Sequence, residues 1–533
     1  MLLFRSSPVF FHAGAQWRTN AATAGLALTL LALSGISAAK PPPSKTAPAN
    51  APPKAEHRLP PAVLQALRQA QVPPSAISVH ITPVGPAGMA ANTASPSTPR
   101  LAHHPDEARN PASVMKLITT WAGLSLLGPD FVWRNRVYAD GPVRDGVLHG
   151  NLVLRGSGDP KLVVERLQDL MARITAAGVR EVRGDIVLDH SVFDLPPRRE
   201  AFDDEPLRPY NVGPDGLLLN FKAVIYTFSP DEAAGLVRVK YEPPLAGFDA
   251  PTELPLSKGP CNDWRSQLRA DFSQPHGVRF AGAYPASCGE RPWPVAFAVP
   301  EVYAPKLIQA LWLGAGGRLT GQVRDGSVPA NARLLLEAPS LPLPEVIADI
   351  NKFSNNVMAQ QLFLTLSSEL GSPGRFEASR LRLSRWWREQ FAGLPEPVLD
   401  NGSGLSRTER SSARGLTAVL HAANASPQAQ VFQNSLSVAG VDGTAARLRE
   451  RNPYSPLIGQ AWLKTGTLRD VVSVAGYVQG QSGQRYAVVA LINHPNAPQA
   501  RPALDQLLEW TVRDANDLAR EPVSAKRQRQ SSP

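Results

Sequence analysis

Three short polar motifs, spread widely along the chain, constrain its fold more than any other feature of the sequence. A Ser-x-x-Lys motif begins at Ser113, a Ser-x-Asn motif at Ser354, and a Lys-Thr-Gly motif at Lys464. Each motif is weak evidence alone, because such short combinations recur by chance in a chain of 533 residues. If the three act together, three remote segments must fold into a single cleft.

The first motif combines a hydroxyl with an amine. Pro111 favours a helix start, and a broad set of apolar residues from Met115 onward predicts a largely buried helix. Ser113 and Lys116 then lie on one face, because positions i and i+3 of a helix are neighbours. A serine becomes a good nucleophile when a base takes its proton, and a lysine can be that base when burial lowers its pKa. Ser113 is the candidate nucleophile and Lys116 the candidate base; the alternative is an ordinary first-turn serine.

The second and third motifs can handle the proton and the substrate. The Ser354 hydroxyl can relay a proton to a leaving amine, and the Asn356 amide can hold a peptide carbonyl. Lys464 and Thr465, on a strand edge, can hold a terminal carboxylate, and Gly466 lets the backbone approach closely. The alternatives are polar residues of a loop or helix cap, and a lysine where a strand meets a turn.

Backbone N–H groups complete the predicted site. Those of Ser113 and Thr467 can together form an oxyanion hole. Penicillin-binding proteins and β-lactamases combine Ser-x-x-Lys, Ser-Asp-Asn and Lys-Thr-Gly in one enzyme. Here Asn355 occupies the middle of the second motif. The ordered set predicts a serine acyl-transfer enzyme, with no cofactor expected.

The N-terminus has the layout of a secretory signal. Arg5 and Arg18 precede an apolar run at residues 24–36, and the small residues 37–39 follow it. The run is shorter than the roughly 20 residues that cross a bilayer, although an uncleaved anchor is the alternative. We expect a signal peptide at 1–39 and a Pro/Ala-rich linker at 40–57, and hence export to the periplasm or cell envelope.

The net charge of +10 favours anionic surroundings, such as nucleic acid, lipid head groups or wall polymer. No basic stripe interleaved with aromatic residues supports nucleic-acid binding. Peripheral association with an anionic wall or membrane surface is therefore the expectation. Part of the excess charge lies in residues 516–533, which we expect to be a disordered basic tail.

The two cysteines, Cys261 and Cys288, predict a structural disulfide in an exported protein. Neither has a His or Cys neighbour at metal-ligand spacing. His103 and His104 stand in a stretch that reads as a loop, so we expect no metal site.

Hydrophobic periodicity predicts the main elements. Apolar residues make up 43% of the chain, which is ample for packed cores. The length of the chain predicts two or more domains. Helices are expected at 162–177, 302–313, 343–370, 378–391 and 502–518. Strands are expected at 76–83, 147–154, 179–189, 460–464, 471–478 and 486–492, the last three as antiparallel neighbours. Residues 194–300 mix strand-like runs with turns.

Longer stretches make the prediction more specific. The chain resembles the D-alanyl-D-alanine carboxypeptidase/endopeptidases of the penicillin-binding protein 4 type, the class C low-molecular-mass group of peptidase family S13. The stretches that carry the resemblance are 110–117, 156–160, 184–189, 400–407, 438–444 and 463–468. Residues 85–107 depart from the family pattern, because that segment is longer and richer in Pro, Ser and His than expected.

The resemblance implies an α/β (α+β) sandwich of the penicillin-binding transpeptidase and β-lactamase type. The catalytic domain would be discontinuous, at 58–161 and 337–515, with inserted domains at 162–336. Ser113 would be acylated by peptidoglycan peptides, water would release the product, and β-lactam antibiotics would acylate the same serine. In relatives an aspartate in a stretch like 158–160 binds the amine of the substrate's diamino acid, which implies that role for Asp159; the alternative is a turn-forming aspartate before Pro160.

Two other functions share this fold. A β-lactamase would need rapid deacylation, and the sequence offers no clear carboxylate for that step. A catalytically silent wall-binding protein would not need the intact set of motif residues.

Overall fold

The computed structural model describes residues 58–88, 98–196 and 201–514. The expected signal peptide, linker and basic tail lie outside these ranges. Within them, no helix is long and apolar enough to cross a membrane.

A six-stranded sheet pairs residues 77–84 with residues 485–493, which lie near opposite ends of the described sequence. Its strand order is β19-β20-β21-β22-β1-β2, and every neighbouring pair is antiparallel. The strands are β1 (Ile77–Val84), β2 (Leu101–His103), β19 (Ser437–Val438), β20 (Ala461–Leu468), β21 (Val471–Gln479) and β22 (Arg485–Asn493). The expected antiparallel neighbours near the C-terminus are confirmed, and β20 continues to Leu468, so the Lys-Thr-Gly motif lies inside a strand.

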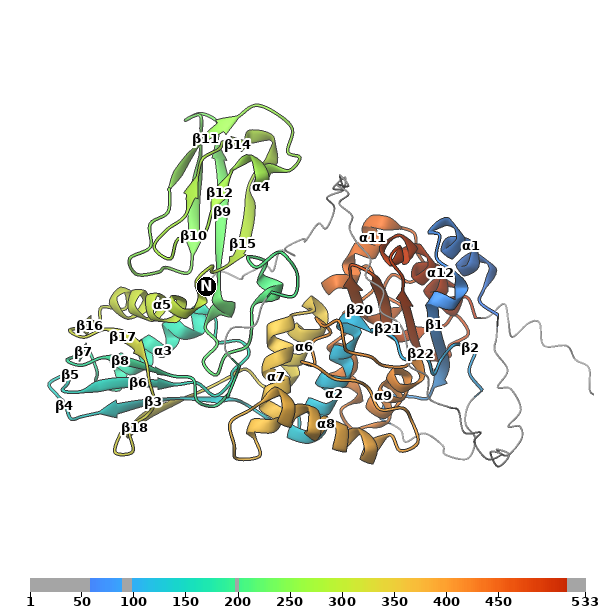
Figure 1. Ribbon diagram of the computed structural model, residues 1–533, viewed down its shortest axis with the longest axis horizontal. Coiled ribbons are helices and arrows are strands. Elements are labelled where there is room, and N and C mark those ends of the chain that lie inside the picture. The colour runs from blue at the N-terminus through green and yellow to red at the C-terminus, as the bar shows by residue number, and fades with distance from the viewer. Residues whose placement is uncertain (1–57, 89–97, 197–200, 515–533) are drawn as a thin grey trace, which may run out of the picture. The chain divides into compact units, whose positions relative to one another are not determined.

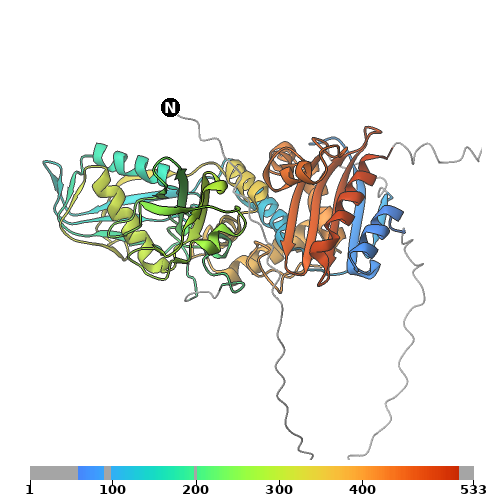
Figure 2. The ribbon, with the colours of Figure 1, turned by 90° about the horizontal axis from the view of Figure 1, so that it is seen from above.

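Helices cover both faces of this sheet, which makes a three-layer sandwich. Along β22, Val488 and Ala490 join one apolar core, whereas Val489 and Leu491 join the other. Because successive side chains of a strand point to opposite faces, an almost continuous apolar run results. One core includes α1 (Pro61–Gln69), α11 (Arg447–Arg451) and α12 (Arg501–Val512); Figure 2 shows α1 and α12 along that face. The other includes α2 (Lys116–Leu127), α6 (Leu343–Phe353), α7 (Asn356–Ser368), α8 (Phe376–Gln390), α9 (Ala413–Ala425) and α10 (Ala429–Asn434). The predicted α/β sandwich is thus confirmed.

The single helix expected at 343–370 is wrong in one respect, because two helices occupy that range. Ser354 takes a left-handed conformation, with φ of 58°, and ends α6. The Asn355 side chain then accepts a hydrogen bond from the Met358 N–H and caps α7. The periodicity continues across the break because both helices bury apolar faces in the same core.

The part of the sequence between the first and second motifs forms a second group of sheets, which has its own apolar core (Figure 1). Its five-stranded sheet has the order β17-β8-β6-β3-β18, and a four-stranded sheet has the order β16-β7-β5-β4. The five strands are β3 (Arg134–Asp140), β6 (Asn151–Arg155), β8 (Ile186–Asp189), β17 (Val323–Asp325) and β18 (Arg333–Pro339). The four are β4 (Val143–Arg144), β5 (Val147–Leu148), β7 (Glu181–Val182) and β16 (Arg318–Leu319). The sheet therefore begins at Arg134, earlier than the expected domain boundary at 162.

The strands expected at 147–154 and 179–189 each divide in two, because each contributes to both sheets. β5 pairs with β7 in one sheet, and β6 pairs with β8 in the other. The chain crosses between sheets where two glycines come close: a Cβ on Gly184 would lie 2.7 Å from the carbonyl oxygen of Gly150. Helices α3 (Val164–Ala176) and α5 (Pro300–Gly314) pack into this core and match the expected helices at 162–177 and 302–313.

The remaining strands form a small sheet of order β14-β11-β10-β9-β15 and a two-stranded ribbon. They are β9 (Ala223–Asp231), β10 (Leu236–Glu242), β11 (Glu253–Ser257), β14 (Tyr284–Pro285) and β15 (Arg291–Ala296), with β12 (Ala270–Asp271), β13 (Arg279–Phe280) and α4 (Trp264–Gln267). An aromatic cluster fills its interior; Phe228, for example, stacks on Tyr284 with 5.5 Å between ring centroids. The predicted disulfide between Cys261 and Cys288 is confirmed and closes this region.

Two smaller expectations differ from the structure. His103 ends β2, and only His104 lies in the turn that follows. The helix expected at 502–518 ends at Val512, and Asp514 then accepts a hydrogen bond from the Ser482 N–H.

Candidate active site

The three motifs meet in one place. The Lys116 Nζ lies 3.0 Å from the Ser113 Oγ and 2.7 Å from the Asn356 Oδ1. The Lys464 Nζ lies 2.8 Å from the Ser354 Oγ. The structure thus brings together five predicted side chains from a turn, two helix ends and a strand.

Ser113 is held in a short 3₁₀ turn, Ala112–Met115, that leads into α2. The carbonyl of Pro111 accepts a 2.7 Å hydrogen bond from the Ser473 hydroxyl on β21. Asn110 anchors the approach to the turn, because its Oδ1 accepts from the Ala112 N–H at 2.8 Å. These bonds tie the nucleophile's backbone to the sheet, while the Ser113 side chain remains partly exposed.

The surroundings of Lys116 favour the neutral form that a base requires. Its side chain is 0% exposed, and burial lowers its pKa to about 7, opposed by the nearby charge of Glu409. A neutral amine has two N–H groups and one lone pair. The Asn356 Oδ1 and the Ser403 carbonyl, which can only accept, take the two N–H groups. The lone pair is then directed at the Ser113 hydroxyl.

The loop that carries Ser403 is organised by Glu409, a residue to which the sequence assigned no role. Glu409 is 0% exposed, and its Oε1 and Oε2 accept hydrogen bonds of 2.8 Å from the N–H groups of Gly402 and Gly404, respectively. Burial raises the pKa of its carboxyl group. The stretch 400–407 carries the family resemblance, but Glu409 lies two residues beyond it and belongs to none of the three motifs.

Ser354 and Lys464 form the second half of the site. The left-handed conformation of Ser354 at the end of α6 turns its hydroxyl toward the strand, where Lys464 donates to it and to the Thr465 carbonyl, both at 2.8 Å. Lys464 is 0% exposed, and burial together with the charge of Lys116 holds its pKa well below the usual value. The pair suits proton relay better than the holding of a negative charge.

The edge of β20 faces the nucleophile. β19 begins at Ser437, opposite Leu463, so from Lys464 onward no strand among the described residues covers this edge of β20. A Cβ on Gly466 would lie 2.8 Å from the Pro111 carbonyl oxygen and 3.0 Å from the Ser113 nitrogen. Glycine is therefore needed there, because only its missing side chain lets β20 come this close to the Ser113 backbone.

Thr465 and Thr467 bind neighbours that the sequence did not suggest. The Thr465 Oγ1 donates to the Thr444 Oγ1 at 2.9 Å, and Thr444 belongs to the stretch 438–444. The exposed Thr467 accepts a 2.8 Å hydrogen bond from the Arg501 guanidinium. Neither partner carries a motif, and both come from segments that only the fold brings to the strand.

Asn356 also contacts the inserted region. Its Nδ2 donates to the backbone carbonyl of Tyr210 at 3.1 Å, while its Oδ1 accepts from Lys116. One Nδ2 proton therefore remains for a substrate carbonyl, which is the role expected of this amide.

Asp159 lies among other partners. Its carboxylate is 2% exposed and accepts hydrogen bonds from Arg166 at 2.7 Å, from Asn135 at 3.0 Å and from the Lys161 N–H at 2.9 Å. The last bond is that of a turn-forming aspartate. This geometry favours the alternative that Asp159 holds a turn, and the predicted contact with a substrate amine stays a prediction. Among the described residues, no group of three His, Cys, Asp or Glu side chains forms a candidate metal site.

A partly exposed serine, a buried lysine with a lowered pKa behind it and a Ser–Lys pair beside a strand define a class of enzyme. They are the site of the serine acyl-transfer enzymes that combine a Ser-x-x-Lys motif with a second serine motif and Lys-Thr-Gly. Residues 84–513 match the D-Ala-D-Ala carboxypeptidase 3 (S13) family. The chain belongs to this family and is a serine hydrolase of the D-Ala-D-Ala carboxypeptidase type, as the sequence predicted.

Individual relatives of known name support the same family. The chain is 31% identical over 441 residues to a D-alanyl-D-alanine carboxypeptidase of Actinomadura sp. strain R39. The matched region covers 77% of this chain and 79% of that protein. It is 26% identical over 389 residues to D-alanyl-D-alanine carboxypeptidase DacB of Haemophilus influenzae, covering 72% and 80% of the two chains. The crystal structure of penicillin-binding protein 4 from Haemophilus influenzae is similar with a TM-score of 0.67 and 22% identity, over 86% of this chain and 99% of that one. That similarity supports the fold.

Proposed function

We propose that the chain hydrolyses D-alanyl peptide bonds of peptidoglycan through an acyl-enzyme on Ser113. The observation that carries this proposal is the geometry at Lys116, whose two N–H groups are bound by carbonyl oxygens while its nitrogen lies 3.0 Å from the Ser113 Oγ. An amine so placed can take the serine proton as the hydroxyl attacks the carbonyl.

The remaining residues have separate roles in the reaction. The N–H groups of Ser113 and Thr467 stabilise the oxyanion of the tetrahedral intermediate. Asn356 holds the peptide carbonyl on the acyl side of the scissile bond. Ser354, hydrogen-bonded to Lys464, delivers a proton to the leaving amine. Water then attacks the ester and regenerates Ser113.

Substrate and compartment follow from the family and the N-terminus. Named relatives are carboxypeptidases, and a penicillin-binding protein 4 structure holds a β-lactam. We infer that peptides ending in D-Ala-D-Ala, or cross-linked through D-alanine, are the substrates, and that β-lactams acylate the same serine. An exported enzyme would meet both in the cell envelope.

Mass spectrometry of the intact protein after incubation with benzylpenicillin tests the proposal. We expect one covalent adduct, located on the peptide that contains Ser113, and no adduct with Ser113→Ala. Release of D-alanine from a D-Ala-D-Ala peptide should be lost in the same variant. An adduct at another residue, or full D-alanine release by Ser113→Ala, would contradict the proposal, and many turnovers of penicillin per second would indicate a β-lactamase.

A further inference from the structure

The site as described leaves one requirement without a residue. A peptide ending in D-alanine carries a carboxylate on the leaving side of the scissile bond, and the sequence assigned its binding to Lys464 and Thr465. Lys464, however, is fully buried and directs its amine at the Ser354 hydroxyl and a backbone carbonyl. Because its amine already donates to these two oxygen atoms, Lys464 has at most one N–H group left for a carboxylate.

Arg501 supplies a cation on the adjacent face of the strand. It begins α12, and its guanidinium donates to the Thr467 hydroxyl at 2.8 Å. Thr465 and Thr467 point to the same face of β20, because side chains two residues apart in a strand share a face. That face is the one that α12 covers, since Leu463 of β20 and Leu504 of α12 join the same apolar core. The guanidinium therefore lies against Thr467, one residue along β20 from Gly466, the glycine that approaches the Ser113 backbone.

This guanidinium lacks a carboxylate partner among the described residues. Arg501 is half-buried. Asp505, the acidic residue whose charge acts on the Arg501 guanidinium, forms its ion pair with Arg451 at 3.1 Å. Arg447 and Arg451 add further positive charge at this place. A guanidinium stays protonated and presents paired N–H groups that match the geometry of a carboxylate. A partly buried cation with incomplete neutralisation is stabilised by an incoming anion.

We propose, on the basis of the function proposed above, that Arg501 binds the terminal carboxylate of the leaving D-amino acid, together with the hydroxyls of Thr465 and Thr467. Arg501 is then the residue that selects substrates with a free carboxylate, and Lys464 is left for proton transfer. The carboxylate of a penicillin would occupy the same position.

The test compares acylation by benzylpenicillin with acylation by its methyl ester, which lacks the negative charge. Wild-type protein should prefer the free acid. Arg501→Gln should slow acylation by the free acid about 10- to 100-fold, the loss expected for one charged hydrogen-bonding contact, and leave the ester within about twofold. Arg501→Lys should recover part of the preference. With a D-Ala-D-Ala peptide, the loss should appear mainly as a higher KM.

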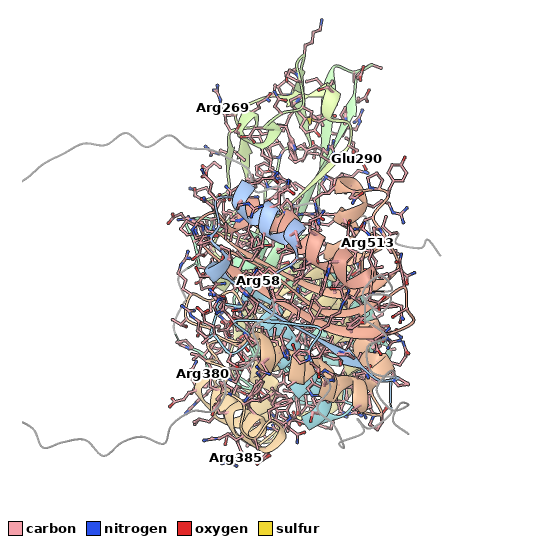
Figure 3. The ribbon with its side chains drawn as sticks, turned by 90° about the vertical axis from the view of Figure 1, so that its right-hand side faces the viewer. Arg58, Arg269, Glu290, Arg380, Arg385 and Arg513 are labelled. Atoms are coloured by element: carbon pink, nitrogen blue, oxygen red, sulfur yellow. A yellow bond between two sulfur atoms is a disulfide. The ribbon has the colours of Figure 1, made fainter. Side chains whose placement is uncertain are left out.

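Arg513→Gln is the matched control, because Arg513 lies beyond the other end of the same helix, where it pairs with Glu509 and is labelled at the surface in Figure 3. It should behave as wild type. The ester reaction reports folding of each variant within the same experiment. Equal slowing of acid and ester by Arg501→Gln, or an undiminished preference for the acid, would overturn the inference. Absence of any adduct on wild-type Ser113 would instead refute the proposed function itself.

Discussion

The two lysines of the site have the same burial and different surroundings. Lys116 donates to two carbonyl oxygens, and burial lowers its pKa while the Glu409 carboxylate of the loop behind it partly opposes that shift. Lys464 contacts a serine hydroxyl and its neighbour's carbonyl, and the charge of Lys116 lowers its pKa further. Two amines in one cleft cannot both carry a charge cheaply, because like charges destabilise each other at short range. The difference assigns the two amines different tasks: one activates the nucleophile and the other serves a relay.

Removing the base should have the largest effect. Lys116→Met keeps the apolar stem but leaves Ser113 with no group to take its proton, so acylation by benzylpenicillin should slow about 10³-fold. Stopped-flow or time-resolved mass measurements would show it. Near-normal acylation by this variant would move the role of base to Lys464 and reverse the comparison.

Removing the relay should cost less. Ser354→Ala leaves Lys116 and Ser113 in contact but deprives the leaving amine of its proton donor, so D-alanine release should fall about 10²-fold. Because β-lactam ring opening leaves the amine attached, we expect peptide turnover to suffer more than penicillin acylation. Parallel measurement of both rates checks this difference, and an effect on penicillin alone would contradict it.

The pH dependence should report Lys116. Its pKa of about 7 means that the amine is protonated, and useless as a base, at lower pH. Acylation should therefore fall about tenfold for each pH unit below 7 and level off above it. A rate profile from pH 5 to 9 measures this, and a rate that is constant down to pH 5 would contradict a lysine base.

Glu409→Gln should weaken the loop and shift that profile. Loss of the carboxylate leaves buried N–H groups with poorer acceptors, at a cost of about 1–3 kcal/mol in the free energy of unfolding. Since Glu409 raises the pKa of Lys116, its neutralisation should lower that pKa and move the acidic limb to lower pH. Denaturant unfolding and the pH–rate profile together test this; an acidic limb that moves upward would be inconsistent with the assigned charge.

The smallest catalytic effect is expected from Asp159→Asn. Because the carboxylate is occupied by Arg166 and Asn135, the variant should lose stability and retain acylation by penicillin within about threefold. If Asp159 instead binds the substrate's diamino acid, the variant will lose far more activity on a peptide that carries this diamino acid than on a peptide that lacks it. Comparison of two such peptides separates the two roles.

The sequence predicted which motif residues meet in the site better than it predicted the residues that hold them in place. The motif residues followed from the ordered set of three motifs, the sheet near the C-terminus from hydrophobic periodicity, and the disulfide from two cysteines in a chain expected to be exported. Glu409, Thr444 and Arg501 did not, because each acts through a contact with a remote segment that no spacing reveals. The break at Ser354 was also missed, since two helices that bury apolar faces in one core keep a continuous pattern across a single left-handed residue.

The bond between the Asn356 amide and the Tyr210 carbonyl has a consequence for the inserted region. That one side chain touches both the catalytic amine and a backbone that belongs to the insertion. A substrate or wall fragment that displaced the segment around Tyr210 would break the hydrogen bond to the Asn356 amide, and the same amide accepts a hydrogen bond from the Lys116 amine. The segment around Tyr210 is therefore linked to the Lys116 amine through a single side chain, that of Asn356.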